Sequence, residues 1–172
     1  MRTYPSAGGD RCTLELKIKE NNIVRKERTR TTVPTAMRLL EAGSLVDDSW
    51  RGDVAAEDHR TLEKILLLRR TRSLRPAVWV SYVRQAFLGA TDARFRLTFD
   101  TDLRATPYIR GQGPARRGRR LLPFDTVVME VKSNEVLPRW LLAVLVNHGC
   151  DMQKISKFCA GVEALSLLAL SR

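Results

Sequence analysis

The stretch "CTLELKIKENNIVRKERTR", residues 12–30, predicts a β-hairpin with one charged face. Between residues 12 and 19, aliphatic and charged side chains alternate strictly, which is the two-residue period of a strand. The pair Asn21-Asn22 favours a turn, and a second strand is expected over residues 24–30. Charged side chains fall on one face of each strand: Glu15, Lys17 and Lys19 on the first, and Lys26, Arg28 and Arg30 on the second.

Three more strands are expected further along the chain, at residues 77–88, 92–100 and 126–132. The last two repeat the pattern of one charged and one aliphatic face, whereas the first carries a single arginine, Arg84. Successive amphipathic strands that are joined by short turns favour antiparallel pairing.

Four helices are predicted, over residues 34–43, 53–73, 137–148 and 153–170. Asp53 is a plausible N-cap for the second helix, and Gly43 ends the first. The Gly- and Arg-rich stretch 111–120 is expected to be a mobile loop. Strands with helices between and after them place the chain in the α+β class.

The composition indicates a folded, basic protein. The chain has 172 residues, of which 44% are hydrophobic, enough for one domain with a sizeable core. Lysines and arginines number 30 against 19 aspartates and glutamates, a formal net charge of +11. Such an excess predicts a polyanionic partner, which can be nucleic acid, an anionic membrane or a phosphate-rich small molecule.

Several signals bear on the cellular compartment. No apolar run reaches the ~18 residues of a transmembrane helix, and the first ten residues, "MRTYPSAGGD", lack the apolar region of a secretory signal. The three cysteines show no C-x-x-C spacing, so we interpret them as reduced, buried thiols rather than zinc ligands. A cytoplasmic location is therefore expected, with any membrane association made only through partners.

The charged strand faces have two interpretations. On a single strand, such a face is commonly the solvated outer face of a sheet. Four strands with the same bias instead favour an antiparallel β-barrel that turns these faces inward around a polar lumen. Basic groups crowded into a lumen repel one another, and they are tolerated where a polyanion normally binds.

Carboxylates lie among these basic residues. In "VVMEVKSNEVLPRWL", residues 127–141, Glu130 and Lys132 fall on the same side of one strand, and Glu15 and Asp100 have similar settings. Each carboxylate either pairs with its basic neighbours or binds a divalent cation that bridges phosphate oxygens. In the second case Lys132 contacts phosphate while Glu130 holds the metal.

Five segments occur in a specific order: "LELKIKENNIVRKERTR", "VSYVRQAF", "FRLTFDTDLRA", "VVMEVKSNEVLPRWL" and "ISKFCAG". Together they resemble the VTC domain, the polyphosphate polymerase domain of the triphosphate tunnel metalloenzyme (CYTH-like) group. The resemblance implies a tunnel-shaped antiparallel β-barrel with flanking helices. It also implies transfer of the γ-phosphoryl group of ATP to inorganic polyphosphate with Mn²⁺ or Mg²⁺. No specific nucleic acid partner is expected, for the reason given below.

The resemblance also implies roles for individual residues. Those matching the family's basic tunnel strands would bind substrate: Arg2, Lys17, Lys26 and Arg28. Four further residues would be catalytic: Arg84, Arg96, Lys132 and Lys157. They match, in this order, the arginine of the family's Y-x-R-x-A-F strand, the arginine before T-x-D, the lysine of E-x-K and the lysine of S-K-[FY]. Glu130 matches the metal-binding glutamate.

The start of the chain departs from the family pattern. The family usually begins with an E-x-K-Y strand, a segment resembling L-Y-F-D-T and an R-x-R strand, of which only the last basic residue is matched, by Arg2. We therefore expect residues 1–172 to form a single VTC-like domain that lacks two or three N-terminal tunnel strands. An incomplete tunnel could leave this chain inactive on its own.

Two other functions are open. One is a tunnel triphosphatase, which would release only orthophosphate, although the S-K-[FY] and L-P-x-W motifs favour the polymerase. The other is a non-catalytic module that binds polyphosphate or nucleic acid. Nucleic acid binding normally uses aromatic side chains among the basic groups, but here the aromatic residues alternate opposite the basic ones.

Overall fold

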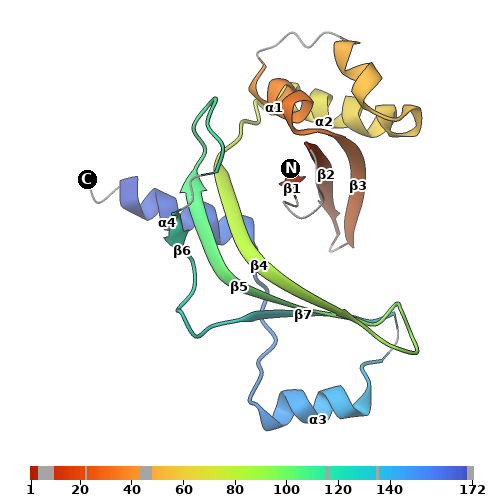
Figure 1. Ribbon diagram of the computed structural model, residues 1–172, viewed down its shortest axis with the longest axis vertical. Helices are drawn as coiled ribbons and strands as arrows, with labels where there is room; N and C mark the ends of the chain where they lie inside the picture. Colours follow the sequence, from red (N-terminus) through yellow and green to blue (C-terminus); the bar gives the residue numbers. More distant parts are fainter. Residues whose placement is uncertain (4–9, 22, 43–47, 115–116, 135, 170–172) are drawn as a thin grey trace. The chain divides into compact units, whose positions relative to one another are not determined.

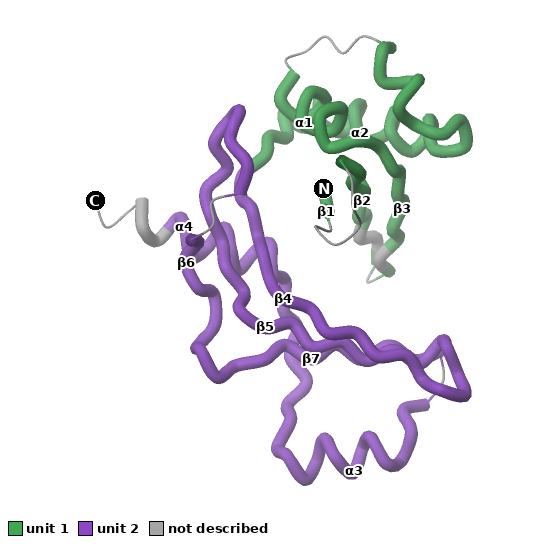
Figure 2. The backbone as a smooth tube through the Cα atoms, in the orientation of Figure 1, with its two compact units in different colours: residues 1–76 green, residues 77–172 purple. Residues whose placement is uncertain are grey.

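The computed structural model describes residues 1–3, 10–21, 23–42, 48–114, 117–134 and 136–169. The chain divides into two compact units, Met1–Pro76 and Ala77–Arg172, which Figure 2 colours separately. Each unit combines an antiparallel sheet with helices (Figure 1). The predicted α+β class is therefore confirmed.

The first unit contains a three-stranded sheet in the order β1 (Arg2–Thr3), β2 (Arg11–Glu20) and β3 (Ile23–Thr32). β2 and β3 form the predicted hairpin, in which Glu15 lies opposite Arg28. In the turn, Asn21 has a φ of 46°, within the left-handed region that asparagine tolerates. Asn22, the other predicted turn residue, lies outside the described residues.

Four helical segments follow β3: α1 (Val33–Glu41), η2 (Asp48–Asp53), η3 (Ala56–Asp58) and α2 (His59–Thr71). α1 begins where the sequence predicts, because Thr32 is its N-cap and accepts a hydrogen bond from the Thr35 amide at 3.2 Å. Pro34 lies in the first turn, where its missing N–H is no loss. Gly43, expected beyond the end of this helix, lies outside the described residues.

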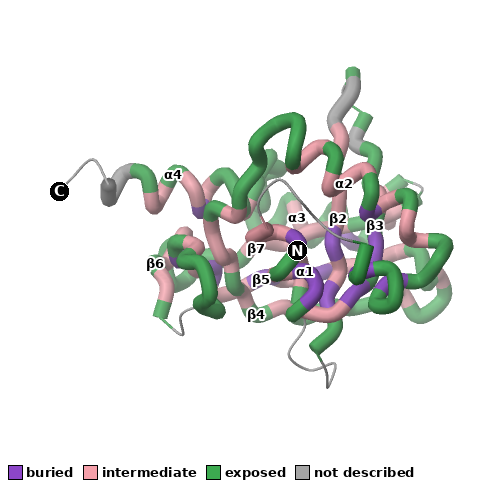
Figure 3. Tube along the Cα trace, turned by 90° about the horizontal axis from the view of Figure 1, so that it is seen from above, coloured by how far each residue is buried: buried purple, intermediate pink, exposed green. Residues whose placement is uncertain are grey.

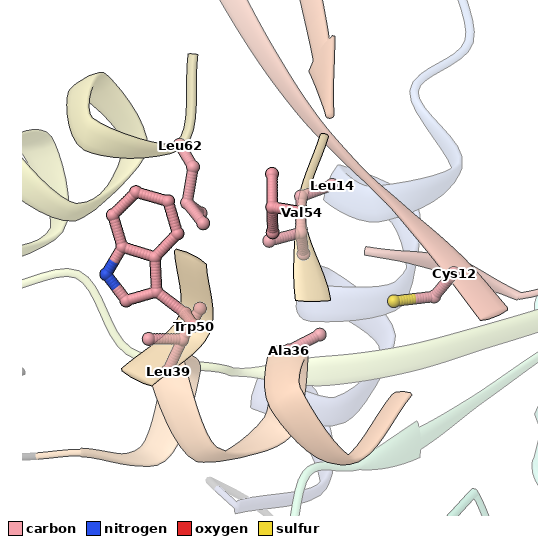
Figure 4. Close-up of a cluster of buried hydrophobic side chains, with 7 residues drawn as sticks. All are labelled: Cys12, Leu14, Ala36, Leu39, Trp50, Val54 and Leu62. Carbon is pink, nitrogen blue, oxygen red and sulfur yellow. The ribbon is translucent and has the colours of Figure 1, made fainter. Parts of the chain in front are cut away.

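Apolar side chains from the hairpin and from these helical segments form one core (Figure 4). Its members are Cys12, Leu14, Ala36, Leu39, Trp50, Val54 and Leu62. Figure 3 shows buried positions on β2, β3 and α1. This core holds the aliphatic face of the hairpin inward, so the face that carries Glu15 and Arg28 lies on the other side of the sheet.

The prediction that a helix begins at Asp53 is wrong. α2 begins at His59, and two 3₁₀ segments precede it. The carboxylate of Asp53 accepts a hydrogen bond from the Thr35 hydroxyl on α1 instead of capping a helix, and the adjacent Val54 is buried in the core. These contacts join residues that are far apart in the chain, so no local sequence pattern predicts them.

The second unit is built on β5 (Arg96–Pro107), which pairs antiparallel with three strands: β4 (Val78–Leu88), β6 (Arg119–Arg120) and β7 (Val128–Lys132). The helices α3 (Arg139–Asn147) and α4 (Lys157–Ala169) follow. α4 packs against β4 and β5 (Figure 1). Gly161 permits this approach, because a Cβ there would lie 3.1 Å from Cγ2 of Val80.

Several boundaries of this sheet differ from the prediction, and β5 continues to Pro107 instead of ending at residue 100. The strand expected over residues 92–100 begins at Arg96, because the Phe95 amide bonds to the Asp92 carbonyl at 3.0 Å in the preceding turn. The stretch 111–120, expected to be a loop, ends in β6, and its residues 115 and 116 lie outside the described ones. A two-residue strand is too short for a periodicity to reveal it.

Smaller features also bear on the predictions. α4 begins at Lys157, four residues later than expected, whereas α3 ends one residue before its predicted end, close to Gly149, which has a φ of 59°. Cys12 is buried as expected, but Cys150 and Cys159 are exposed. Within the described parts of the chain, every helix is too short or too polar to cross a lipid bilayer.

The predicted antiparallel β-barrel is not confirmed. Among the described strands, β3 of the first unit pairs only with β2, and β4 of the second pairs only with β5. Each sheet, taken by itself, is therefore open. The barrel, its lumen and the single domain over residues 1–172 stay predictions.

Replacing Gly118 by alanine should destabilise the second unit by about 1–3 kcal/mol. A Cβ at this position would lie 2.8 Å from the backbone oxygen of Ala105, so β6 would have to move away from β5. Urea denaturation measures the effect. Gly113→Ala is the matched control, because a Cβ there has nothing within 4 Å. Equal losses in the two variants would contradict this explanation.

Candidate functional site

One face of the second unit's sheet collects charged residues from three strands. The pairs in register are Arg84 with Asp100, Thr98 with Glu130, and Arg96 with Lys132. Residues directly opposite on antiparallel strands project to the same face, and alternate residues of one strand do so too. Three bases and two acids therefore share this face.

Asp100 is the buried centre of the face, with 1% of its side chain exposed. Arg84 donates two hydrogen bonds to it, from Nε to Oδ1 at 2.6 Å and from Nη2 to Oδ2 at 2.7 Å. Nζ of Lys157, the first residue of α4, lies 2.9 Å from Oδ2. Burial acts to raise the pKa of the Asp100 carboxyl, but Arg84 and Lys157 outweigh it and hold that pKa below its ordinary value. Asp100 is therefore ionised at neutral pH.

Tyr82 supports the same two cations. Its ring centroid lies 5.1 Å from Cζ of Arg84 and 5.4 Å from Nζ of Lys157. Both distances fall within the range of a favourable cation–π interaction. Each cation is thus held by an aromatic ring as well as by a carboxylate, while 23% of the Arg84 side chain and 20% of the Lys157 side chain stay exposed.

Glu130 is the accessible carboxylate of this face, with 42% of its side chain exposed. Its oxygens lie 3.3 Å from Nζ of Lys132 and 3.8 Å from Nη2 of Arg84. Partial burial acts to raise its pKa, but Lys132, Arg84 and Lys157 outweigh this and the pKa is lowered. The described residues hold no group of three or more His, Cys, Asp and Glu side chains arranged for a metal ion.

Arg96 has an unsatisfied donor. Its Nε is buried and makes no hydrogen bond to any described residue. A buried donor without an acceptor costs about 1–3 kcal/mol, so an acceptor that binds there gains more than it would at a solvated arginine. Because Arg96 lies opposite Lys132, an anion on this face would meet both side chains.

A second cluster lies on the first unit's sheet around Glu15, whose side chain is 6% exposed. Its carboxylate lies 2.8 Å from Nε of Arg28, 3.4 Å from Nζ of Lys17 and 3.7 Å from Nη2 of Arg2. Burial acts to raise the pKa of Glu15, but these cations outweigh it and the pKa is lowered. The exposed Lys26 lies opposite Lys17, so it belongs to the same face.

The predicted site residues therefore form two groups. The four expected to bind substrate meet in the first unit: Arg2, Lys17, Lys26 and Arg28. The others meet in the second: Arg84, Arg96, Glu130, Lys132 and Lys157. Each group surrounds a carboxylate with arginines and lysines, which is an arrangement suited to a polyanion that carries many phosphate groups.

A family model described as the VTC domain matches residues 1–166. The chain belongs to the VTC domain family. The resemblance that the five sequence segments predict is thereby confirmed. A comparison with curated proteins gave no match.

Two residues central to this charged face, Asp100 and Tyr82, are not among the predicted functional residues. For Asp100 the sequence indicates only an ion pair or a metal ligand, and for Tyr82 it indicates no role. Their importance depends on the register of β4 against β5 and on the packing of α4. A signal for Asp100 was present, because it is an acid that alternates with apolar residues on a strand otherwise rich in arginine.

Glu15→Gln should lower the melting temperature of this VTC domain and enlarge the further rise caused by tripolyphosphate. The substitution leaves Arg2, Lys17 and Arg28 without their shared anion, a loss of about 1–3 kcal/mol. A polyphosphate can then supply the missing charge. Thermal melts with tripolyphosphate, and with sulfate at matched ionic strength, measure both effects.

Glu27→Gln is the matched control for that experiment. Glu27 lies on β3, the other strand of the same hairpin, but it pairs with Lys64 of α2, at 2.7 Å. This variant should lose stability without changing the response to tripolyphosphate. If both variants responded alike, the Glu15 cluster would have no special relation to polyphosphate.

Proposed function

We propose that this VTC domain transfers the γ-phosphoryl group of ATP to a polyphosphate chain, with Mn²⁺ or Mg²⁺ as cofactor. The observation that carries the proposal is the grouping of family-matched cations with an accessible glutamate, Glu130, in the second unit: Arg84, Arg96, Lys132 and Lys157. Membership of the VTC family supports the substrate class.

The reaction requires no covalent nucleophile from the protein. An oxygen of the chain's terminal phosphate attacks the γ-phosphorus of ATP. The bond from that phosphorus to the β–γ bridging oxygen breaks, and ADP leaves with the electron pair. Catalysis then consists of positioning the phosphates and neutralising their charge. Arginine guanidinium groups can bind phosphate oxygens in pairs, whereas the lysines act as point charges.

The residues present fit the implied divalent cation. Mg²⁺ and Mn²⁺ prefer oxygen ligands, and they commonly bind through one or two carboxylates together with substrate phosphates. Glu130 offers such a carboxylate, because it is exposed and its lowered pKa keeps it ionised. It would hold the ion, and the ion would neutralise charge on the phosphate oxygens.

The aromatic residues favour a phosphate chain over nucleic acid. Proteins that bind single strands stack bases on aromatic rings among the basic residues. Here Phe87 and Phe99 pack edge to face at 6.0 Å on the other side of the sheet. Tyr82, which shares the cationic side, is already in contact with Arg84 and Lys157.

The test is incubation of the purified chain with ATP, Mn²⁺ and a short polyphosphate primer. Formation of ADP together with longer chains, seen on a gel, would support the polymerase. Orthophosphate without chain growth would indicate a triphosphatase, and no turnover with retained binding would indicate a non-catalytic module. Lys157→Ala should lose activity, whereas Arg139→Ala, at an exposed position on α3, should keep it.

A further inference from the structure

Asp100 differs from every other acid and base in the described part of the chain, because it alone is fully buried. Its neighbours come from two other elements, Arg84 from β4 and Lys157 from α4. A buried carboxylate is costly unless it is paired and hydrogen-bonded. Asp100 takes no part in the proposed reaction, so its burial needs an explanation.

Direct contact with substrate does not explain it. Oδ1 accepts from Nε of Arg84, and Oδ2 accepts from Nη2 of Arg84 and lies 2.9 Å from Nζ of Lys157. Both oxygens are therefore occupied and shielded from solvent. A phosphate brought against this carboxylate would also be repelled, because both are negatively charged.

The contacts of Asp100 decide instead where its two cations point. The bidentate bond fixes the plane of the Arg84 guanidinium, and Nη1 is left without a partner among the described residues. One of the three Nζ protons of Lys157 is directed to Asp100, which leaves two for another acceptor. The unengaged donors of both side chains are thus held in fixed directions before any substrate arrives.

We propose that Asp100 is a positioning residue that aligns Arg84 and Lys157 for the transferred phosphoryl group. This inference rests on the proposed function. Long cationic side chains otherwise lose rotamer freedom when they bind. A displacement of about 1 Å in a phosphoryl-transfer site can reduce the rate by about 100-fold, so the alignment matters to catalysis and not only to stability.

The decisive variant is Asp100→Asn, which keeps the size of the side chain and removes its charge. Isothermal titration of the full chain should be made with tripolyphosphate and with sulfate at matched ionic strength. Removing the charge of Asp100 should raise the affinity for both ligands. Lost alignment of Arg84 and Lys157 should weaken the binding of tripolyphosphate, which contacts several cations at once, more than that of sulfate. We expect the ratio of tripolyphosphate to sulfate affinity to fall by about 10-fold or more. An unchanged ratio in folded Asp100→Asn would overturn the proposal.

Leu103→Ala controls for stability, because Leu103 is buried on the same strand and its apolar side chain makes none of the cluster's hydrogen bonds or ion pairs. It should destabilise the chain without altering the ratio. If Asp100→Asn does not fold, Asp100→Glu decides the question, because it keeps the charge but moves the carboxylate. Alignment predicts a reduced ratio in this variant as well, and an unchanged ratio would again overturn the proposal.

Turnover provides a separate readout. In an active chain, Asp100→Asn should lower kcat by about 10–100-fold, in addition to any change in KM for ATP. A change in KM for ATP alone, with kcat unchanged, would overturn the positioning role. Absence of chain growth in the unmodified protein would remove the proposed function, but the affinity ratio would still decide whether Asp100 aligns the two cations.

Discussion

Replacing Glu130 by glutamine should abolish metal-dependent chain growth while leaving polyanion binding in place. Glutamine has nearly the same size but carries no charge, so it is a poor ligand for Mn²⁺ or Mg²⁺. Mutation of a residue that only supports a metal ligand typically reduces metal affinity or activity by about 10–100-fold. Loss of a direct ligand should therefore reduce turnover by at least about 100-fold. The neighbouring Lys132 and Arg84 lose a competing anion, so affinity for tripolyphosphate should be unchanged or higher.

Two measurements check this expectation. The rate of ADP formation should be followed against Mn²⁺ concentration, and the melting temperature against tripolyphosphate concentration. Glu163→Gln makes the same substitution at an exposed position on α4 of the same unit and should behave as the unmodified chain. Unaltered metal-dependent turnover in Glu130→Gln would exclude Glu130 as a metal ligand.

The elements that the sequence predicted well are those with local causes. The β2–β3 hairpin follows from strict alternation over residues 12–19 and from a turn that asparagine can adopt. α1 follows from Thr32 and Pro34 at its start. The cations of the site were predictable in the same way, because alternation alone places Lys17, or Glu130 with Lys132, on a single face of a strand.

The elements that were missed depend on contacts between distant segments. The Asp53 carboxylate is taken by Thr35, so the expected helix begins only at His59. The pairing of Arg84 with Asp100 depends on the register of β4 against β5, which the alternation within each strand does not fix. The sequence therefore indicated which cations take part, but not which carboxylate holds them.

Arg84→Ala should lower the free energy of unfolding of the second unit by about 3 kcal/mol, as expected when one partner of a buried ion pair is removed. The loss arises because the buried Asp100 keeps its charge with Lys157 alone. Asp100→Asn in the same chain removes that uncompensated charge. The double variant should therefore be more stable than the sum of the single losses predicts, by about 1–3 kcal/mol. Urea denaturation of the four proteins gives this coupling energy.

Arg104→Ala supplies the comparison that separates burial from pairing. Arg104 donates to Asp102 at 2.9 Å on the same strand, but 40% of the Asp102 side chain is exposed. An exposed pair of this kind is screened by solvent and stabilises the fold only weakly, so the loss should be much smaller than that for Arg84. Additive losses for Arg84 and Asp100, to within about 0.5 kcal/mol, would mean that the two residues do not stabilise each other. The charges of the cluster would then be energetically independent of one another. In that case the hydrogen-bonded pair of Arg84 and Asp100 would explain neither the burial of Asp100 nor the alignment of Arg84.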